Sequence, residues 1–457
     1  MRIRFLVTVA VLIIALVQIA RWIFGSGLSK TGLIVIAVLL AGFVMLCVLV
    51  GRSQKQIQRK VEAADKALAA GDYSACLRLC DSALAIVRKM NLRANDVIAM
   101  ALVVRSEASQ KLGKNDEALQ AAAQAFGCLC GVQSGLAQVS ILDRLGYLLV
   151  EMRLEQRAIP VLEAVVKLSE CADPDPIRIT SRLEHLGMAY LRVGAHAKSV
   201  AAFGKAIDTL SKQLGPDAAG LASPYINLGN GYKRLEKKQD AERCYREALR
   251  IYDVNNVKDV ARYSIVLLNL GVVCAESGRN EDAEGYYQQV LEMRVAALGG
   301  NDWRVGNTYN NLAMCRLRAR DFESAERYIQ SAIGILEEHP EWLSNALATL
   351  ALIREDQGRI EEALAAVTRA REAQQNLSTP NLSELAGQYD REAALASRIG
   401  DVERAEEARS RAAQQRQALA GVGPRESDAA NMGEALKTLD EHLQASIKHV
   451  QTMQEAV

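Results

Sequence analysis

The chain has 457 residues, of which 55 are Lys or Arg and 54 are Asp or Glu, so its formal net charge is +1. This balance gives no overall attraction to nucleic acid, and no nucleic-acid partner is expected. Aromatic residues make up 5% and prolines number 8, a composition that favours helix throughout. The nine cysteines are an odd number with no C-x-x-C pair, which argues against a disulfide framework and favours a reducing compartment.

Two apolar runs open the chain, FLVTVAVLIIALVQIA at residues 5–20 and TGLIVIAVLLAGFVMLCVLV at residues 31–50. Each approaches the ~20 residues that a helix needs to cross a bilayer. A cleaved signal peptide is the alternative for the first run, but no A-x-A-like site follows it and a second run comes at once. We therefore expect residues 1–54 to form a two-helix transmembrane hairpin, with the lipid bilayer contacted through residues 5–50.

Basic residues flank this hairpin on its outer sides, whereas the short link between the runs carries only two, at its borders. The outer ones are Arg2, Arg4, Arg52, Lys55, Arg59 and Lys60, and the border ones are Arg21 and Lys30. An excess of Lys and Arg marks the cytoplasmic side of membrane proteins. The sequence thus predicts an integral protein of a bacterial inner membrane, with both termini and everything after the hairpin in the cytoplasm.

Residues 55–418 alternate helical patterns with short polar turns, and three copies between Tyr225 and Ala332 superimpose at one constant offset. One column holds Gly229, Gly271 and Ala313; a second holds Ala241, Ala283 and Ala325; a third holds Asn227, Asn269 and Asn311. Self-similarity at such a period is typical of a solenoid, in which each unit packs on its neighbours.

The pattern within each copy resembles the tetratricopeptide repeat. A small residue lies in the first helix with an aromatic or apolar residue three positions later, a glycine marks the turn, and Ala, an aromatic and Ala follow in the second helix. The clearest copies carry Gly187, Tyr190, Gly194, Phe203 and Ala206; Gly229, Tyr232, Ala241, Tyr245 and Ala248; and Gly271, Cys274, Gly278, Ala283 and Tyr287.

Small residues suit places where two helices touch closely, and aromatic rings fill the space between pairs. The 42-residue spacing exceeds the family's usual ~34 and is similar to the longer-helix variety found in kinesin light chains. The resemblance implies an all-α fold, a right-handed α-solenoid of about nine helix pairs at residues 55–418. The apolar runs add two transmembrane helices before it.

The tail changes character twice. Residues 419–428 contain AGVGPRESD, which predicts a linker. Residues 429–457 return to a helical pattern whose apolar stripe consists of Met432, Leu436, Leu439, Leu443, Ile447 and Val450. We expect this amphipathic helix to cap the last repeat; pairing with a partner is the alternative.

Signals of catalysis are absent from the sequence. It contains no nucleotide-binding loop, zinc-protease motif or nucleophile elbow, and its five histidines are dispersed. Cys76 and Cys80 lie one helical turn apart, but Cys76 occupies a small-residue column, so core packing is the expected role. No catalytic, cofactor-binding or metal site is predicted, and the chain is expected not to be an enzyme.

The asparagine column is the first candidate binding feature. Asn227, Asn269 and Asn311 each precede the small residue of the first helix by two positions, and His185 occupies the same column one repeat earlier. An amide both donates and accepts, which suits the main chain of an extended peptide. The resemblance to kinesin light chains implies that such asparagines line the concave face.

A second column lies seven positions further along, roughly two helical turns, and holds Arg192, Arg234, Glu276 and Arg318. Arginines bind carboxylates with two parallel hydrogen bonds, which favours an acidic peptide. The alternative is a solvated face whose arginines pair with neighbouring glutamates. The predicted peptide-binding groove therefore comprises His185, Asn227, Asn269, Asn311, Arg192, Arg234 and Arg318.

Together these features predict a membrane-anchored scaffold or adaptor that binds proteins or extended peptides in its concave groove, without a cofactor. The alternative is a structural organiser of a membrane complex that self-associates, as a homo-oligomer, and has no groove ligand. The sequence does not identify the partner.

Overall fold

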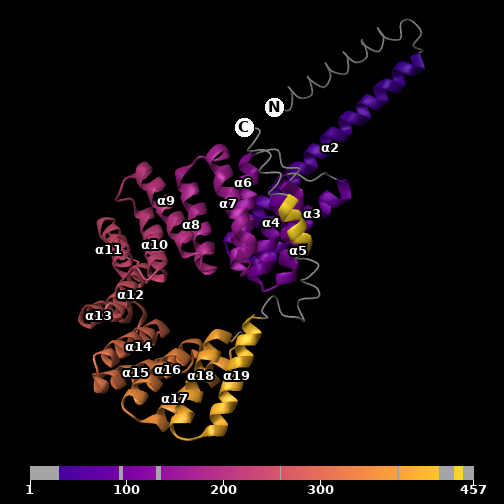
Figure 1. The fold of residues 1–457 in the computed structure, drawn as a ribbon. Helices are drawn as coiled ribbons and strands as arrows, with labels where there is room; N and C mark the ends of the chain where they lie inside the picture. The colour runs from indigo at the N-terminus through magenta and orange to yellow at the C-terminus, as the bar shows by residue number, and fades with distance from the viewer. Residues whose placement is uncertain are drawn as a thin grey trace. The chain divides into compact units, whose positions relative to one another are not determined.

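The computed structural model describes residues 30–91, 96–129, 135–257, 259–377, 380–420 and 437–445 (Figure 1). Every regular element among these residues is a helix, so the expected all-α fold is confirmed. The chain divides into two compact units. Unit 1 comprises Met1–Leu168 and Asn431–Val457, and unit 2 comprises Ser169–Ala430, so that unit 2 is inserted between the two segments of unit 1.

The helices follow one another in antiparallel pairs. Those that begin in unit 1 are α2 (Lys30–Ala69), α3 (Tyr73–Met90), α4 (Asp96–Lys111), α5 (Asn115–Cys128), α6 (Gly135–Glu151) and α7 (Glu155–Ala172), with a further short helix at residues 437–445. Those of unit 2 are α8 (Pro176–Arg192), α9 (His196–Leu214), η3 (Ala219–Leu221), α10 (Ala222–Arg234), α11 (Lys238–Val254), α12 (Val260–Glu276), α13 (Asn280–Leu298), α14 (Trp303–Arg318), α15 (Phe322–Leu336), α16 (Pro340–Asp356), α17 (Ile360–Gln375), α18 (Leu382–Arg398) and α19 (Val402–Ala420).

Packing within unit 2 follows the order of a solenoid. The first helix of each pair packs on the second, as α8 does on α9 and α10 on α11, and the second packs on the first helix of the next pair. First helices of successive pairs also touch, as α8 does α10 and α14 does α16. Counted in sequence order over the described helices, α2–α19 make nine pairs, which matches the expected number.

Glycine faces an aromatic ring at the centre of three of these pairs. A Cβ atom on Gly187 would lie 2.7 Å from Cε1 of Phe203, and one on Gly229 would lie 2.6 Å from Cε1 of Tyr245. Gly271 meets Tyr287 in the same way. The small-residue column therefore exists because a buried ring occupies the position of the missing side chain.

The turn between the two helices of a pair repeats one backbone conformation. Gly194 and Gly278 have φ of 77° and 79°, in the left-handed region that glycine adopts without strain. Between them and after them, at the same 42-residue interval, Glu236 and Arg320 hold φ of 59° and 58°. Side chains at these two turns are thus kept at a conformational cost of roughly 1–2 kcal/mol each.

The expected membrane hairpin is tested little by the structure. Its first span, residues 5–20, lies outside the described residues, and so do most side chains of the second, residues 31–50, whose backbone belongs to α2. No helix in the described part of the chain is both long and apolar enough to cross a membrane. The long helix α2 runs without a break through residue 54, where the hairpin was expected to end.

The tail departs from the expectation of a cap on the last repeat. Residues 437–445 belong to unit 1, and two residues of the apolar stripe, Leu439 and Leu443, are buried there. Asp440 pairs with Arg157 of α7. The capping role is therefore wrong for these residues; most of the expected linker and the rest of the expected helix lie outside the described residues.

Candidate binding surface

The asparagine column lies on the first helices of three successive pairs. Asn227, Asn269 and Asn311 are half-buried within α10, α12 and α14. Nδ2 of Asn227 donates to Oε1 of Glu184 on α8 at 3.3 Å, whereas Asn269 and Asn311 make no side-chain hydrogen bond among the described residues. Two of the three amides are therefore available to a ligand, and the third is shared with a carboxylate.

That carboxylate was not predicted from the sequence. Glu184 also accepts a hydrogen bond from Oγ of Ser223, at 2.8 Å. Burial raises the pKa of Glu184, and the hydrogen bonds from Ser223 and Asn227 and the neighbouring His185 oppose that rise. His185, the next residue of α8, is half-buried and has an interaction partner of its own.

The arginine column falls at helix ends. Arg192, Arg234, Glu276 and Arg318 are the last residues of α8, α10, α12 and α14, and all four are exposed. A helix C-terminus carries partial negative charge and stabilises a cation by ~0.3–1 kcal/mol. This dipole effect accounts for the arginines on structural grounds alone, and an additional role needs a second observation.

A hollow of about 640 Å³ supplies that observation. It gathers three of the four column residues, together with neighbours from the turns and from adjacent helices. The lining residues are His196, Lys233, Arg234, Glu236, Lys238, Ala275, Glu276 and Arg318. The structure thus brings Arg234 and Arg318 to one site, whereas Arg192 is not part of its lining.

Cations outnumber acids in this hollow. Lys233, Arg234, Lys238 and Arg318 line it together with two glutamates. Burial lowers the pKa of Lys233, against the opposing effect of Glu276. Lys238 caps α12 by donating from Nζ to the carbonyl oxygen of Glu276 at 2.6 Å.

Two of these cations, Arg234 and Arg318, form no ion pair with any residue that the structure describes. Glu242 of α11 pairs with Arg279, and Glu284 of α13 pairs with Arg316. The two glutamates of the lining, Glu236 and Glu276, also form no ion pair among the described residues. The hollow therefore presents two unpaired guanidinium groups to solvent. Such groups bind carboxylate or phosphate oxygens with two parallel hydrogen bonds.

The lysines of the hollow and His196 escaped the sequence analysis for a geometric reason. They belong to the ends of helices in neighbouring pairs, and only packing of one pair on the next brings them beside Arg318. Aligning the sequence at 42-residue intervals compares equivalent positions of the repeats. It does not show which turn residue of one repeat contacts the helix end of the next.

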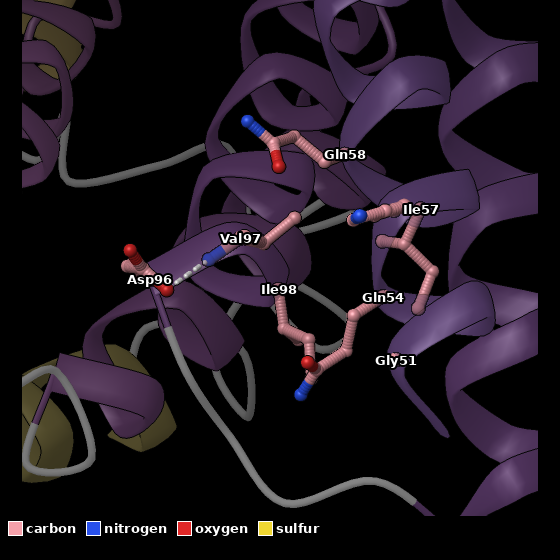
Figure 2. Close-up of a pocket in the computed structure, with 8 residues that line it drawn as sticks. Gly51, Gln54, Ile57, Gln58, Asp96, Val97 and Ile98 are labelled. Atoms are coloured by element: carbon pink, nitrogen blue, oxygen red, sulfur yellow. Dashed lines mark hydrogen bonds between the residues drawn. The ribbon is translucent and has the colours of Figure 1, made fainter. Parts of the chain in front are cut away.

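Unit 1 has a second hollow, of about 370 Å³ (Figure 2). It lies between α2, which supplies Gly51, Gln54 and Gln58 among others, and the first turn of α4. Asp96 accepts a hydrogen bond from the backbone N–H of Val97 at the start of that helix. Its lining shows amides, one lysine and one carboxylate, without a nucleophile beside a base.

The two cysteines of α3 pack in the core. Cys76 and Cys80 are fully buried in a cluster with Ala64, Val104 and Ala108. Their mutual hydrogen bond is the largest influence on both thiols and raises the pKa of Cys80 while lowering the pKa of Cys76. In the described part of the chain, no group of three or more His, Cys, Asp or Glu side chains is arranged to hold a metal ion.

Comparison with known proteins bears on the repeats. The model of the family described as "Tetratricopeptide repeat" matches residues 179–253 and 262–338. No curated protein sequence matches the chain. The matched ranges contain every asparagine of the column and both arginines of the hollow.

Solved structures of similar fold include the apo form of RapI and the apo form of the quorum sensor NprR from B. thuringiensis. RapI is 10% identical over 80% of this chain and 99% of its own, with a TM-score of 0.58. NprR is 16% identical over 79% and 99%, with a TM-score of 0.52. The repeats of a putative kinesin light chain from Podosopora anserina are 14% identical over 44% and 95%, with a TM-score of 0.41.

At these identities the likeness concerns the fold alone. The family model, the paired helices and the glycine–aromatic contacts agree over the same stretch of unit 2. Residues 179–253 and 262–338 are therefore tetratricopeptide repeats, carried by an all-α solenoid.

Proposed function

We propose that the chain is a scaffold or adaptor that binds extended, acidic segments of partner proteins across α10, α12 and α14. The observation that carries this proposal is the basic hollow, in which Arg234 and Arg318 lie together without a carboxylate partner among the described residues. Solvated arginines on an ordinary helix face would be expected to pair with nearby glutamates. Several arginines elsewhere in unit 2 do so, as Arg316 does with Glu284.

The spacing of the asparagines supports an extended ligand. Asn227, Asn269 and Asn311 occupy the same position of α10, α12 and α14, the first helices of three successive pairs. A peptide lying across these helices would therefore meet one amide per repeat. Each amide can donate to a carbonyl and accept from an N–H of the peptide main chain.

The hollow supports the acidic character of the ligand. Arg234 follows Asn227 by seven positions on α10, which is roughly 10 Å along the helix axis. A Glu or Asp side chain of a peptide bound at the asparagines reaches part of that distance, and the exposed arginine side chains reach the rest. The peptide main chain would thus be bound by asparagines within these helices, and its acidic side chains by the arginines at the helix ends.

The test compares two charge-reversed chains of equal net charge. One carries Arg234→Glu and Arg318→Glu in the hollow; the control carries Arg243→Glu and Arg262→Glu, which are exposed and lie outside it. Fluorescence anisotropy follows a glutamate-rich peptide and its glutamine counterpart. We expect the hollow variant to bind the acidic peptide at least tenfold more weakly, and the control to bind within about threefold of wild type.

The asparagines are tested separately, by replacing Asn227, Asn269 and Asn311 with Ala and capturing partners from lysate. Loss of captured partners, with an unchanged circular dichroism spectrum, is expected. If both the hollow variant and the asparagine variant retain full binding, the groove is not the ligand site.

We also infer that the chain is anchored in a membrane through residues 5–50, with the repeats facing the cytoplasm. The support is the sequence alone: two long apolar runs and Lys and Arg at their outer borders. Alkaline extraction should leave the chain in the membrane pellet, and protease added to spheroplasts should spare the repeats. Release by alkali, or digestion of unit 2 from outside, would refute the anchor or the orientation respectively.

A further inference from the structure

The basic hollow is bordered by the ends of five helices. Its lining includes the last residues of α10, α12 and α14 and the first residues of α9 and α11. A helix end carries about half a unit charge, negative at the C-terminus and positive at the N-terminus. Three ends of one sign and two of the other leave only about half a negative charge. The charge of the hollow is therefore set by its side chains.

These side-chain charges do not cancel. The charged residues of the lining are Lys233, Arg234, Lys238 and Arg318 on the positive side and Glu236 and Glu276 on the negative side. Four cations less two acids leave a surplus of two positive charges, with His196 counted as neutral. No ion pair joins any of these side chains to another residue within the described ranges. The surplus is thus left for a ligand to neutralise.

Hydrogen-bonding groups of the lining are also left over. Nδ1 of His196 is buried and has no hydrogen-bond partner among the residues that the structure describes. Arg234 and Arg318 are exposed, and each guanidinium can donate two parallel hydrogen bonds to one anion. Lys238 is held in place by its bond to the carbonyl oxygen of Glu276. A ligand that suits this lining therefore carries several acceptor oxygens on one group.

The half-buried Lys233 adds a reason for an anion to enter. Burial lowers the pKa of its ammonium group, and the neighbouring Arg234 lowers it further, against the opposing effect of Glu276. An opposite charge brought close favours the charged form of such a group. A bound anion would thus offset the electrostatic cost of keeping Lys233 charged beside Arg234.

We propose that the hollow takes a phosphorylated side chain of the segment that lies across the asparagines. The inference rests on the proposed function and specifies the group that enters the hollow. A carboxylate carries one negative charge, whereas a phosphate monoester carries about −1.5 to −2 near pH 7 and three strong acceptor oxygens. A dianion neutralises the surplus of two positive charges, and a single carboxylate leaves half of it unmet.

The size of the hollow agrees with this occupant. Sites for small molecules measure about 300–1,000 Å³. At about 640 Å³ the hollow has room for a phosphorylated side chain together with the part of the segment that carries it. A phosphate group is also large enough to accept hydrogen bonds from Arg234 and Arg318 at the same time.

The test compares three glutamate-rich peptides that differ only at one central residue, which is phosphoserine, glutamate or serine. Fluorescence anisotropy measures their binding to the full-length chain. We expect the phosphoserine peptide to bind about tenfold more tightly than the glutamate peptide, because it makes further charge-assisted hydrogen bonds. Arg234→Glu with Arg318→Glu should abolish this preference, and the control Arg243→Glu with Arg262→Glu should keep it.

The outcomes separate this inference from the function on which it rests. If the phosphoserine and glutamate peptides bind equally well, the phosphate assignment fails while binding of acidic segments stands. If none of the three peptides binds, the proposed function fails as well. A preference that survives charge reversal in the hollow would place the phosphate elsewhere and would overturn the inference.

A series of charge variants tests the surplus itself. Lys233→Met keeps the length of the side chain and reduces the surplus to one, whereas Glu236→Gln keeps its shape and raises the surplus to three. We expect the ratio of phosphoserine to glutamate affinity to fall in the first variant and to rise in the second, by about threefold each. Because Glu236 is exposed, its variant keeps the test valid even if Lys233→Met does not fold.

The matched control is Glu341→Gln, an exposed change on α16 outside the hollow, which alters net charge equally and should leave the ratio unchanged. An unchanged ratio in the Glu236→Gln variant would contradict the charge argument.

Competition distinguishes a phosphorylated segment from a free phosphate compound. Inorganic phosphate and free phosphoserine should displace the phosphoserine peptide only at concentrations about a hundredfold or more above its Kd. Replacement of the three asparagines of the column by Ala should weaken the phosphoserine and glutamate peptides by the same factor. If free phosphoserine competes as well as the peptide, or if the asparagine variant binds the phosphoserine peptide as wild type does, the hollow does not act together with the asparagines and the inference is overturned.

Discussion

The contact between Gly229 and Tyr245 gives the sharpest test of how the repeats are held together. In Gly229→Ala the new Cβ would lie 2.6 Å from Cε1 and 2.9 Å from Cδ1 and Cζ of the ring. Carbon atoms in good contact are ~3.5–4.0 Å apart, so the ring must move by roughly 1 Å. Tyr245 is fully buried and its hydroxyl donates to Oδ1 of Asn230 at 2.7 Å, so the ring has little freedom to move.

The magnitude follows from two opposing effects. Overpacking of a well-filled core costs about 1–3 kcal/mol, and loss of geometry in the Tyr245–Asn230 hydrogen bond adds about 1 kcal/mol. Replacing a helical glycine with alanine returns about 1 kcal/mol through helix propensity. The free energy of unfolding of Gly229→Ala should therefore fall by about 1–3 kcal/mol.

Matched controls lie in the second helices of neighbouring pairs. Gly204 in α9 and Gly285 in α13 are helical glycines with no atom within 4 Å of an added Cβ. Gly204→Ala and Gly285→Ala should therefore stabilise by about 0.5–1 kcal/mol. Urea unfolding of the full chain, followed by circular dichroism, compares the midpoints at constant slope.

The opposite signs make the comparison decisive. If Gly229→Ala shifts the midpoint upward together with the two controls, the ring does not occupy the glycine's space and the assignment of the column fails. A double variant with Tyr245→Leu offers a second check, since the cost of the two changes together should be smaller than the sum of their separate costs.

Two further expectations concern charge in unit 2. Glu392 is 5% exposed and accepts hydrogen bonds from Arg371 of α17 and Arg404 of α19, so Glu392→Gln should lower the free energy of unfolding by about 2–3 kcal/mol in the same urea assay. As a control, Glu407→Gln at an exposed ion pair should change the free energy of unfolding by less than about 0.5 kcal/mol. Equal effects of the two substitutions would contradict this interpretation. The hydrogen bond from Arg304 lowers the pKa of Asp302 from 3.8 to about 2. Because the pKa of Asp302 is lower in the folded state, its ionised form stabilises the fold at pH values above the ordinary carboxyl pKa, and this stability is lost as the pH falls toward 2. Wild type should therefore lose stability between pH 4 and pH 2 more steeply than Asp302→Asn, which keeps a side-chain oxygen to cap α14.

Much of unit 2 was predictable because its repeat makes packing a local matter. The glycine column and the aromatic column keep one constant separation along the sequence, and Gly229 meets Tyr245 as that separation implies. Partnerships that cross from one repeat to another were not predictable in the same way. Lys238 reaches the end of α12, and Glu184 reaches Asn227, only after one pair has packed on the next.

The tail shows a different limit of sequence reasoning. Its stripe identified Leu439 and Leu443 as apolar contacts, and both are buried. A stripe defines which side of a helix is covered but carries no information about what covers it, so the contacts with Ala123 of α5 and Arg157 of α7 were missed. Gly127 was the available signal, since a glycine within α5 lets another element approach closely.

The recurring left-handed turn has a consequence for how a ligand lying along the array finds its position. Gly194 and Gly278 leave bare backbone at their turns, whereas Glu236 and Arg320 place a charged side chain at theirs. Successive pairs between residues 176 and 336 thus alternate in chemistry, although their backbones are alike. A bound segment that shifted by one pair would meet a glycine turn where it had met a turn with a charged side chain. The two positions would then differ in binding free energy, whereas a strictly uniform repeat would bind the segment equally well at both.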